Sequence, residues 1–176
     1  MTLLSMCSLA RFVVLLVLVT GSASAAERFE HPYFKGLSGE WVGTGSLTNA
    51  EGETTEIVEE WSASKTEDDT FTASGRRQWG EENQEFRWVF SYNVTTEAYE
   101  CEYWHTGMED PIRLEVSLSD NRAEMRTSGA SGTELTVANT LVEGGIEGEV
   151  SVRGEGGREV LEGTVTHERR QQSTPE

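Results

Sequence analysis

A cysteine, two tyrosines, a tryptophan and a histidine lie within the stretch YECEYWHTG, residues 99–107. A thiol and an imidazole can act together as nucleophile and base if their side chains touch. However, Cys101 and His105 are four residues apart in a segment with the alternation of a strand, which separates them by about 13 Å at roughly 3.3 Å per residue. They are too far apart for direct proton transfer, and we expect Cys101 to be a small core residue.

Other patterns that support catalysis or metal binding are missing from the sequence. The three histidines, His31, His105 and His167, show neither H-x-H nor H-x-x-x-H spacing, so they form no local zinc motif. The acidic run at 67–69 lacks the glycine and terminal glutamate of a calcium loop. No phosphate loop, nucleophile elbow or dinucleotide fingerprint occurs. We therefore expect a protein that is not an enzyme and that requires no metal and no cofactor.

The first 25 residues have the composition of a secretion signal. Arg11 precedes an apolar run from Phe12 to Val19, and small residues follow up to Ala25. The run is shorter than the roughly 20 residues that cross a bilayer as a helix. We expect cleavage of residues 1–25, no membrane span afterwards, and a secreted or periplasmic location. An uncleaved N-terminal anchor is the alternative.

The composition of the remaining chain limits its class and its partners. One Arg and no acidic residue leave with the signal, so the net charge changes from −17 to −18. Nucleic acids and anionic membranes require basic surfaces, so we expect neither as a partner. Only Cys101 remains, which excludes an internal disulfide. We expect one domain over residues 26–169 and a disordered tail over residues 170–176.

Short alternating runs separated by Gly, Asn and Asp turns continue from Gly39 onward and predict an all-β fold. We expect strands near 39–48, 53–63, 70–79, 84–94, 98–106, 111–118, 122–128, 133–142, 146–153 and 159–168, after one helical turn between His31 and Leu37. Because short gaps favour hairpins, these strands predict an antiparallel up-and-down β-barrel of about 8–10 strands. A sandwich with crossing connections is the alternative.

Side chains alternate along a strand, so the apolar positions also identify which polar residues face the interior. The predicted inward-facing residues that are polar, ionisable or contain sulfur are Glu59, Arg77, Tyr92, Cys101, Tyr103, His105, Asn139 and His167. An unpaired buried charge costs several kcal/mol, so Glu59 and Arg77 must pair, stay hydrated or contact a ligand. Inward-facing glycines such as Gly43 and Gly75 either leave space for a ligand or mark bends of the strands.

A barrel of this size is about wide enough to hold one small ligand. We predict that a small, largely apolar ligand binds inside it, against Glu59, Arg77, Trp88, Tyr92, Tyr103 and His105. Binding through the outer surface to an unknown protein partner is a second hypothesis, because Trp104 lies on the polar face of its strand.

Three sequence features carry a family resemblance. Gly39-Glu40-Trp41 resembles the G-x-W opening of lipocalin and calycin barrels, which implies that Trp41 covers a closed barrel end and packs against Arg169. The segments LSGEWVGTG, VEEWSA and LEGTVTHER are similar to an exported bacterial calycin-like family of unknown function. The glycine pattern of residues 39–45 also resembles nitrobindin-type haem barrels, which implies haem ligation by His167, although the segment that precedes the ligand in that family is missing here.

Overall fold

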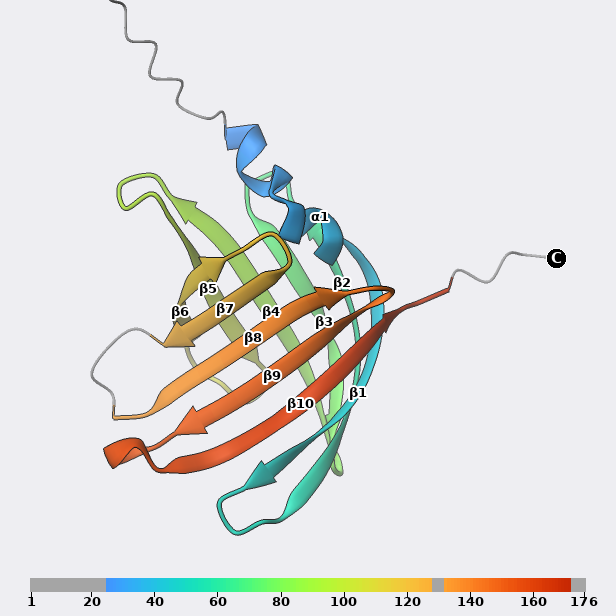
Figure 1. Ribbon diagram of the computed structural model, residues 1–176, viewed down its shortest axis with the longest axis vertical. Coiled ribbons are helices and arrows are strands. Elements are labelled where there is room, and N and C mark those ends of the chain that lie inside the picture. The colour runs from blue at the N-terminus through green and yellow to red at the C-terminus, as the bar shows by residue number, and fades with distance from the viewer. Residues whose placement is uncertain (1–24, 128–131, 172–176) are drawn as a thin grey trace, which may run out of the picture.

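The computed structural model describes residues 25–127 and 132–171, which form a closed barrel of ten antiparallel strands (Figure 1). The strands are β1 (Gly39–Asn49), β2 (Thr54–Lys65), β3 (Phe71–Trp79), β4 (Glu82–Asn93), β5 (Ala98–His105), β6 (Ile112–Leu118), β7 (Arg122–Thr127), β8 (Glu134–Val142), β9 (Gly145–Arg153) and β10 (Glu159–Arg169). Every predicted strand is therefore present, with bounds that differ by no more than two residues. The predicted signal before Ala25 and the tail beyond residue 171 lie outside the described residues.

Each strand pairs with its neighbour in sequence, and β1 pairs with β10 to close the barrel. This sequential order of the strands excludes a sandwich with crossing connections. Closure leaves no exposed strand edge that could pair with another chain. Within the described part of the chain, no helix is long and apolar enough to cross a membrane.

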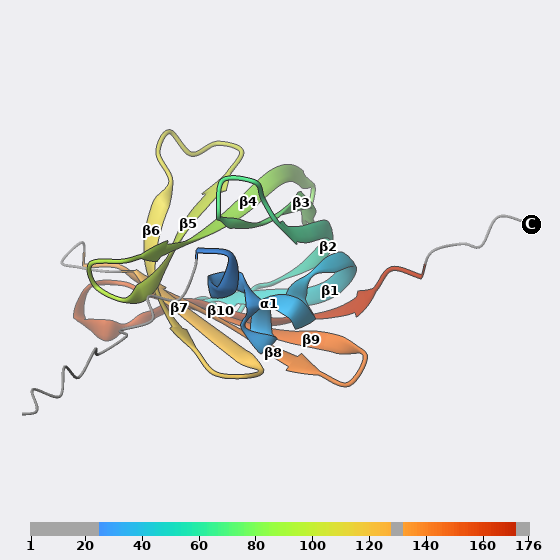
Figure 2. The same ribbon diagram turned by 90° about the horizontal axis from the view of Figure 1, so that it is seen from above.

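The segment before β1 packs into one end of the barrel. It consists of the 3₁₀ helix η1 (Ala25–Glu30) and the short helix α1 (Pro32–Leu37), and both views place it over the same barrel end (Figures 1 and 2). His31 caps α1, since its Nδ1 accepts a hydrogen bond from the Tyr33 amide at 3.2 Å. The buried side chains that close this end are Phe29, Tyr33, Phe34 and Leu37, and we call them the plug.

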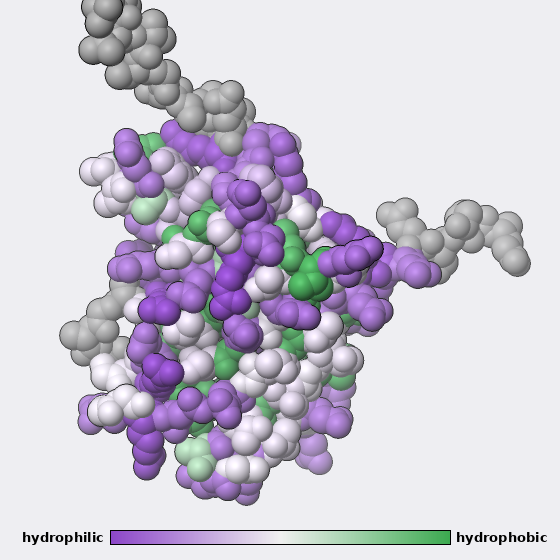
Figure 3. All heavy atoms as spheres, viewed as in Figure 1, coloured by the Kyte–Doolittle hydropathy of each residue, from purple (hydrophilic) through white to green (hydrophobic). Residues whose placement is uncertain are grey.

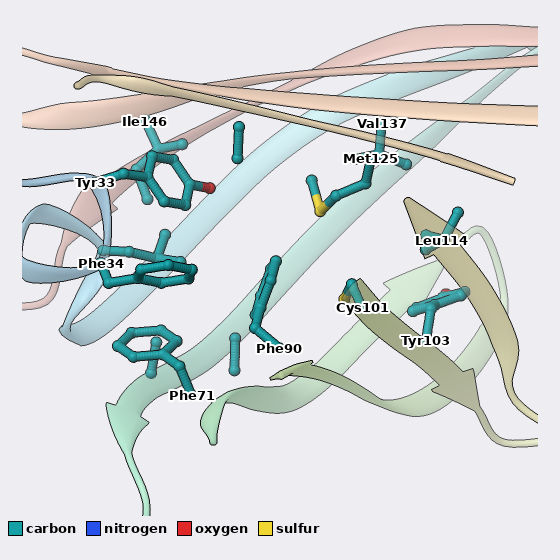
Figure 4. Close-up of a cluster of buried hydrophobic side chains, with 14 of the residues drawn as sticks. Tyr33, Phe34, Phe71, Phe90, Cys101, Tyr103, Leu114, Met125, Val137 and Ile146 are labelled. Atoms are coloured by element: carbon teal, nitrogen blue, oxygen red, sulfur yellow. The ribbon is translucent and has the colours of Figure 1, made fainter. Parts of the chain in front are cut away.

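The plug continues into the hydrophobic core. Phe34 has no exposed surface and contacts the rings of Phe71 and Phe90 at centroid distances of 5.0 and 5.5 Å. Figure 4 shows Tyr33, Phe34 and Phe71 on one side of this cluster. The predicted helical turn between His31 and Leu37 is thus confirmed, and it completes the core.

Trp41 and Arg169 join the plug to the barrel. They are paired positions of β1 and β10, and the guanidinium carbon of Arg169 lies 4.5 Å from the centre of the Trp41 ring. Arg169 also donates hydrogen bonds of 2.8 Å to the carbonyls of Gly36 and Ser38. The indole N–H of Trp41 donates to the carbonyl of Leu37 at 2.9 Å. The predicted contact of Trp41 with Arg169 is therefore confirmed.

Some inward-facing glycines allow backbones to approach closely. A Cβ on Gly45, Gly75 or Gly163 would lie 2.0–2.1 Å from a carbonyl oxygen of the neighbouring strand. These glycines are sites of close strand approach, which accords with the tight coiling of a closed barrel. The outer face visible in Figure 3 is mostly hydrophilic, with separate hydrophobic patches, as the acidic composition leads one to expect.

Candidate ligand-binding site

A cavity of about 260 Å³ lies inside the barrel. Leu37 of the plug borders it, and most of its wall consists of aliphatic and aromatic side chains of the strands. An apolar cavity of roughly 150 Å³ is large enough to bind benzene. The cavity is therefore large enough for a molecule of one or two rings.

The cavity faces the end of the barrel opposite to the plug. Several lining residues occupy the strand ends furthest from α1 and are only partly buried there. These rim residues are Trp79, His105, Ile112, Leu135, Val152 and Leu161. The rim is the open end of the barrel, since the plug fills the other end.

A connected group of polar side chains crosses one wall of the cavity. Glu59 accepts a hydrogen bond from Nε2 of His167 at 2.9 Å, and its other oxygen lies 3.8 Å from Nη1 of Arg77. Nη2 of Arg77 donates to the hydroxyl of Tyr103. We call these four residues the polar chain. Of the three alternatives expected for Glu59 and Arg77, the structure shows that they pair with each other.

Burial and charge have opposite effects on Tyr103. Burial raises the pKa of its hydroxyl, and the neighbouring Arg77 guanidinium opposes this rise in pKa. Because burial dominates, Tyr103 stays a neutral phenol. Its oxygen accepts from Arg77, so its own hydrogen remains able to donate to a ligand.

The register of three strand pairs assembles the polar chain. His167 is opposite Gly43, Gly43 is opposite Glu59, and Glu59 is opposite Arg77, all on inward-facing positions. Gly43 lies between the two residues that bond, and a Cβ there would be 2.1 Å from Cδ2 of His167. The absent side chain of Gly43 thus makes the space in which the imidazole reaches Glu59 across an intervening strand.

Two nitrogen atoms of the polar chain are buried and have no hydrogen-bond partner among the described residues. They are Nδ1 of His167 and Nε of Arg77. Buried polar groups in folded proteins nearly always have partners. These atoms are the unsatisfied hydrogen-bonding groups of this wall.

Most residues of the predicted site line the cavity, namely Glu59, Arg77, Trp88, Tyr103 and His105. The aromatic rings of Trp88 and Tyr103 pack at a centroid distance of 4.2 Å. His105 lies at the rim, where its Nδ1 is 2.7 Å from the carbonyl oxygen of Thr106.

Tyr92 is the exception and does not line the cavity. Its ring packs against Tyr99 at 5.1 Å and lies 4.9 Å from the guanidinium carbon of Arg28, next to the plug. Alternation along β4 correctly predicts that the side chain points inward, but it carries no information about the position of the residue along the barrel axis. The inclusion of Tyr92 among residues around the cavity is corrected for this reason.

Three further residues line the cavity but do not belong to the predicted ligand-binding set, namely His167, Trp61 and Leu37. The alternation of side chains along their strands points His167 and Trp61 inward, as it does the residues of the predicted site. The sequence therefore contained a signal that could have identified both residues. Leu37 had no such signal, because its position depends on how the plug docks. Asn139, predicted to face inward, also borders the cavity.

Cys101 packs in the core, and Trp104 makes a hydrogen bond to a nearby residue of the chain. Cys101 is 1% exposed, and burial strongly raises the pKa of its thiol, which opposes formation of a nucleophilic thiolate. The indole N–H of Trp104 donates to the carbonyl of Met108 at 3.2 Å. A role of Trp104 in a protein interface stays a prediction. No cluster of three potential metal ligands occurs within residues 25–127 and 132–171.

Comparison with known proteins supports the fold and no sequence family. No family model and no curated protein sequence matches the chain. The structure is similar to the S-type phycobiliprotein lyase CPES from Guillardia theta, with 10% identity, a TM-score of 0.57, and coverage of 86% of this chain and 96% of the lyase. It is also similar to Rv2717c from M. tuberculosis, with 12% identity, a TM-score of 0.58, and coverage of 84% and 99%.

A third similar structure is a DUF3598 family protein of unknown function from Nostoc punctiforme, with 13% identity and a TM-score of 0.51. The similarity covers 77% of this chain and 48% of that longer protein. At such low identities the likenesses concern the fold alone. The chain is thus a closed ten-stranded antiparallel barrel of the calycin-like type.

Proposed function

We propose that this protein is an exported, non-catalytic barrel that binds a small, largely apolar ligand in its interior. The observation that carries the proposal is the 260 Å³ cavity, whose mostly apolar wall includes two buried nitrogen atoms without partners. Binding sites for small molecules typically combine an apolar lining with a few polar groups that orient the ligand. The inert surroundings of Cys101 support a non-catalytic role.

The volume favours a compact ligand. Pockets for drug-sized molecules usually measure about 300–1,000 Å³, so this cavity lies just below that range. Transfer of apolar ligand surface from water into the cavity stabilises the complex by roughly 25 cal/mol per Å². A molecule of one or two rings therefore suits the cavity better than a long lipid chain.

We expect Val150→Trp to weaken the binding of naphthalene at least tenfold. Val150 lines the cavity, and an indole there occupies the volume that the ligand needs. Isothermal titration calorimetry measures the affinity, and a change in tryptophan fluorescence reports entry of the ligand into the cavity, which Trp61, Trp79 and Trp88 line. The matched control is Glu149→Trp, because residue 149 is exposed on the opposite face of β9.

Unchanged affinity in Val150→Trp, with both variants folded, places the bound molecule outside the cavity and contradicts the proposal. Absence of naphthalene binding to the unmodified protein also counts against it, unless native mass spectrometry of protein from an exporting host shows a tightly bound molecule of similar size. Such a molecule would have to be removed by unfolding and refolding before the titration.

Haem binding through His167 is a second candidate, favoured by one observation. Histidines that bind metals usually donate their other ring N–H to a carboxylate or carbonyl, as His167 donates to Glu59. Against it, the cavity is smaller than typical pockets for drug-sized ligands, and haem exceeds most of these in size. Titration with haem distinguishes the two candidates: an intense visible absorption band that His167→Phe abolishes would support haem and displace our first proposal.

Export gives a separate expected result. When the full chain is produced in a host with a secretory pathway, we expect the mature protein to begin at Ala26, after the small residues that end the apolar segment. Intact mass and N-terminal sequencing measure this. A chain that keeps residues 1–25 and sediments with membranes would instead support the uncleaved anchor.

A further inference from the structure

The chemistry of His167 narrows the class of ligand, on the basis of the proposed binding function. Its side chain is 6% exposed, borders the cavity, and packs edge-on against Trp61 at 5.2 Å. Gly43 provides the space that the ring occupies. The imidazole is therefore held in one place by its neighbours, and its two nitrogens have different roles.

The bond to Glu59 determines which nitrogen of a neutral His167 carries the hydrogen. Glu59 is paired with Arg77, so its carboxylate only accepts hydrogen bonds. Nε2, which lies 2.9 Å from Oε2 of Glu59, must then be the protonated nitrogen. Nδ1 is left with a lone pair and no hydrogen. It is thus a buried acceptor without a donor among the described residues.

With a neutral His167, the polar chain has no net charge to offer an ionised ligand. The charges of Glu59 and Arg77 cancel, and Tyr103 is a neutral phenol. The rest of the wall is mainly apolar, so a carboxylate or an ammonium group in the cavity would be left without a counter-charge. An uncharged ligand avoids this cost.

A hydroxyl group suits the unpartnered atoms better than a group that only accepts. Its hydrogen can bond to Nδ1 of His167, which a group that only accepts hydrogen bonds cannot do. We infer that the barrel is selective for uncharged one- or two-ring alcohols, phenols or N–H heterocycles, with His167 Nδ1 as the acceptor that recognises the donor group.

Four related probes test this inference by isothermal titration calorimetry: naphthalene, 1-naphthol, 1-methoxynaphthalene and 1-naphthoate. The ether keeps the oxygen of naphthol but has no hydrogen to donate, naphthalene controls for size, and naphthoate carries a charge. We expect 1-naphthol to bind about tenfold more tightly than the ether and naphthalene, as the gain of one buried hydrogen bond implies. We expect naphthoate to bind most weakly.

Two variants locate the preference. His167→Phe keeps a ring beside Trp61 but removes the acceptor, so we expect naphthol and naphthalene to bind it with similar affinity. Glu59→Gln serves as the second variant in case His167→Phe does not fold. Its amide can donate to Nε2 as well as accept from it, which removes the constraint on the imidazole hydrogen, and we expect the naphthol preference to fall severalfold.

The outcomes separate the inference from the proposed function. If all the uncharged probes bind the unmodified barrel equally well, the inference is wrong and the proposed function stands. If naphthoate binds most tightly, an acidic ligand replaces the inferred class. If His167→Phe folds and keeps the naphthol preference, His167 is not the acceptor. If no probe binds to protein freed of any co-purified molecule, the proposed function fails together with the inference.

Discussion

Replacement of Phe34 by alanine is expected to lower the free energy of unfolding by about 3–5 kcal/mol, the largest effect of any single substitution considered for this protein. Phe34 has no exposed surface and is the centre of the plug. Its ring lies 4.9–5.5 Å from the rings of Phe29, Tyr33, Phe71, Phe90 and Tyr99. Alanine leaves a void that these rings, held by strands and by the plug itself, can fill only in part.

Urea unfolding followed by tryptophan fluorescence measures this loss. Lys35→Ala is the matched control, since Lys35 is the next residue of α1 and its side chain is exposed, with an ion pair to Glu30 on the surface. Its expected effect is within about 0.5 kcal/mol. A loss below about 1 kcal/mol for Phe34→Ala would contradict the docking of the plug into the barrel.

Replacement of Arg77 by methionine is expected to destabilise the fold by about 2–4 kcal/mol. The guanidinium pairs with Glu59 and donates to Tyr103, and both side chains of the ion pair are only 13% exposed. Removal of one partner of a buried ion pair commonly costs about 3–5 kcal/mol, because the other charge stays buried. We reduce this figure because Glu59 keeps its hydrogen bond to His167.

Arg76→Met controls for the general effect of losing an arginine in β3. Arg76 is adjacent in sequence but exposed on the opposite face, and it is expected to change stability by less than about 0.5 kcal/mol. Unfolding in urea again provides the measurement. Equal losses from Arg76→Met and Arg77→Met would contradict a special role for the buried arginine.

The double variant Glu59→Met and Arg77→Met identifies the origin of the Arg77 effect. If the cost comes from the carboxylate left behind, removal of that carboxylate should restore about 1–2 kcal/mol. The double variant should then be more stable than Arg77→Met alone. If the losses of stability measured for Glu59→Met and for Arg77→Met alone simply add up in the double variant, the contributions of Glu59 and Arg77 to stability are independent.

Much of the fold could be predicted because barrel strands show local patterns. Strand 84–94, with Phe86, Trp88 and Phe90 on one face, illustrates why: alternation shows both the strand and its buried side. Turn residues between such runs show where hairpins occur. The order of the strands then follows from short connections, so the closed antiparallel barrel was within reach of the sequence.

The candidate site could be predicted only in part. The alternation of side chains correctly placed Glu59, Arg77 and Tyr103 inside the barrel. It placed Tyr92 there in the same way, but Tyr92 lies beside the plug and away from the cavity. Alternation distinguishes the inside of a barrel from the outside. It contains no information on distance along the barrel axis, which depends on the tilt and stagger of the closed strands.

The sequence by itself determined the all-β class, the positions of the strands, the inward direction of the polar residues and the acidic exterior, because each of these depends on neighbours along the chain. Only the tertiary structure decided that His167 reaches Glu59 across Gly43, that the plug fills one end, and that a cavity remains. These features join residues up to 133 positions apart. They arise from barrel closure and strand register, which depend on the packing of all ten strands together.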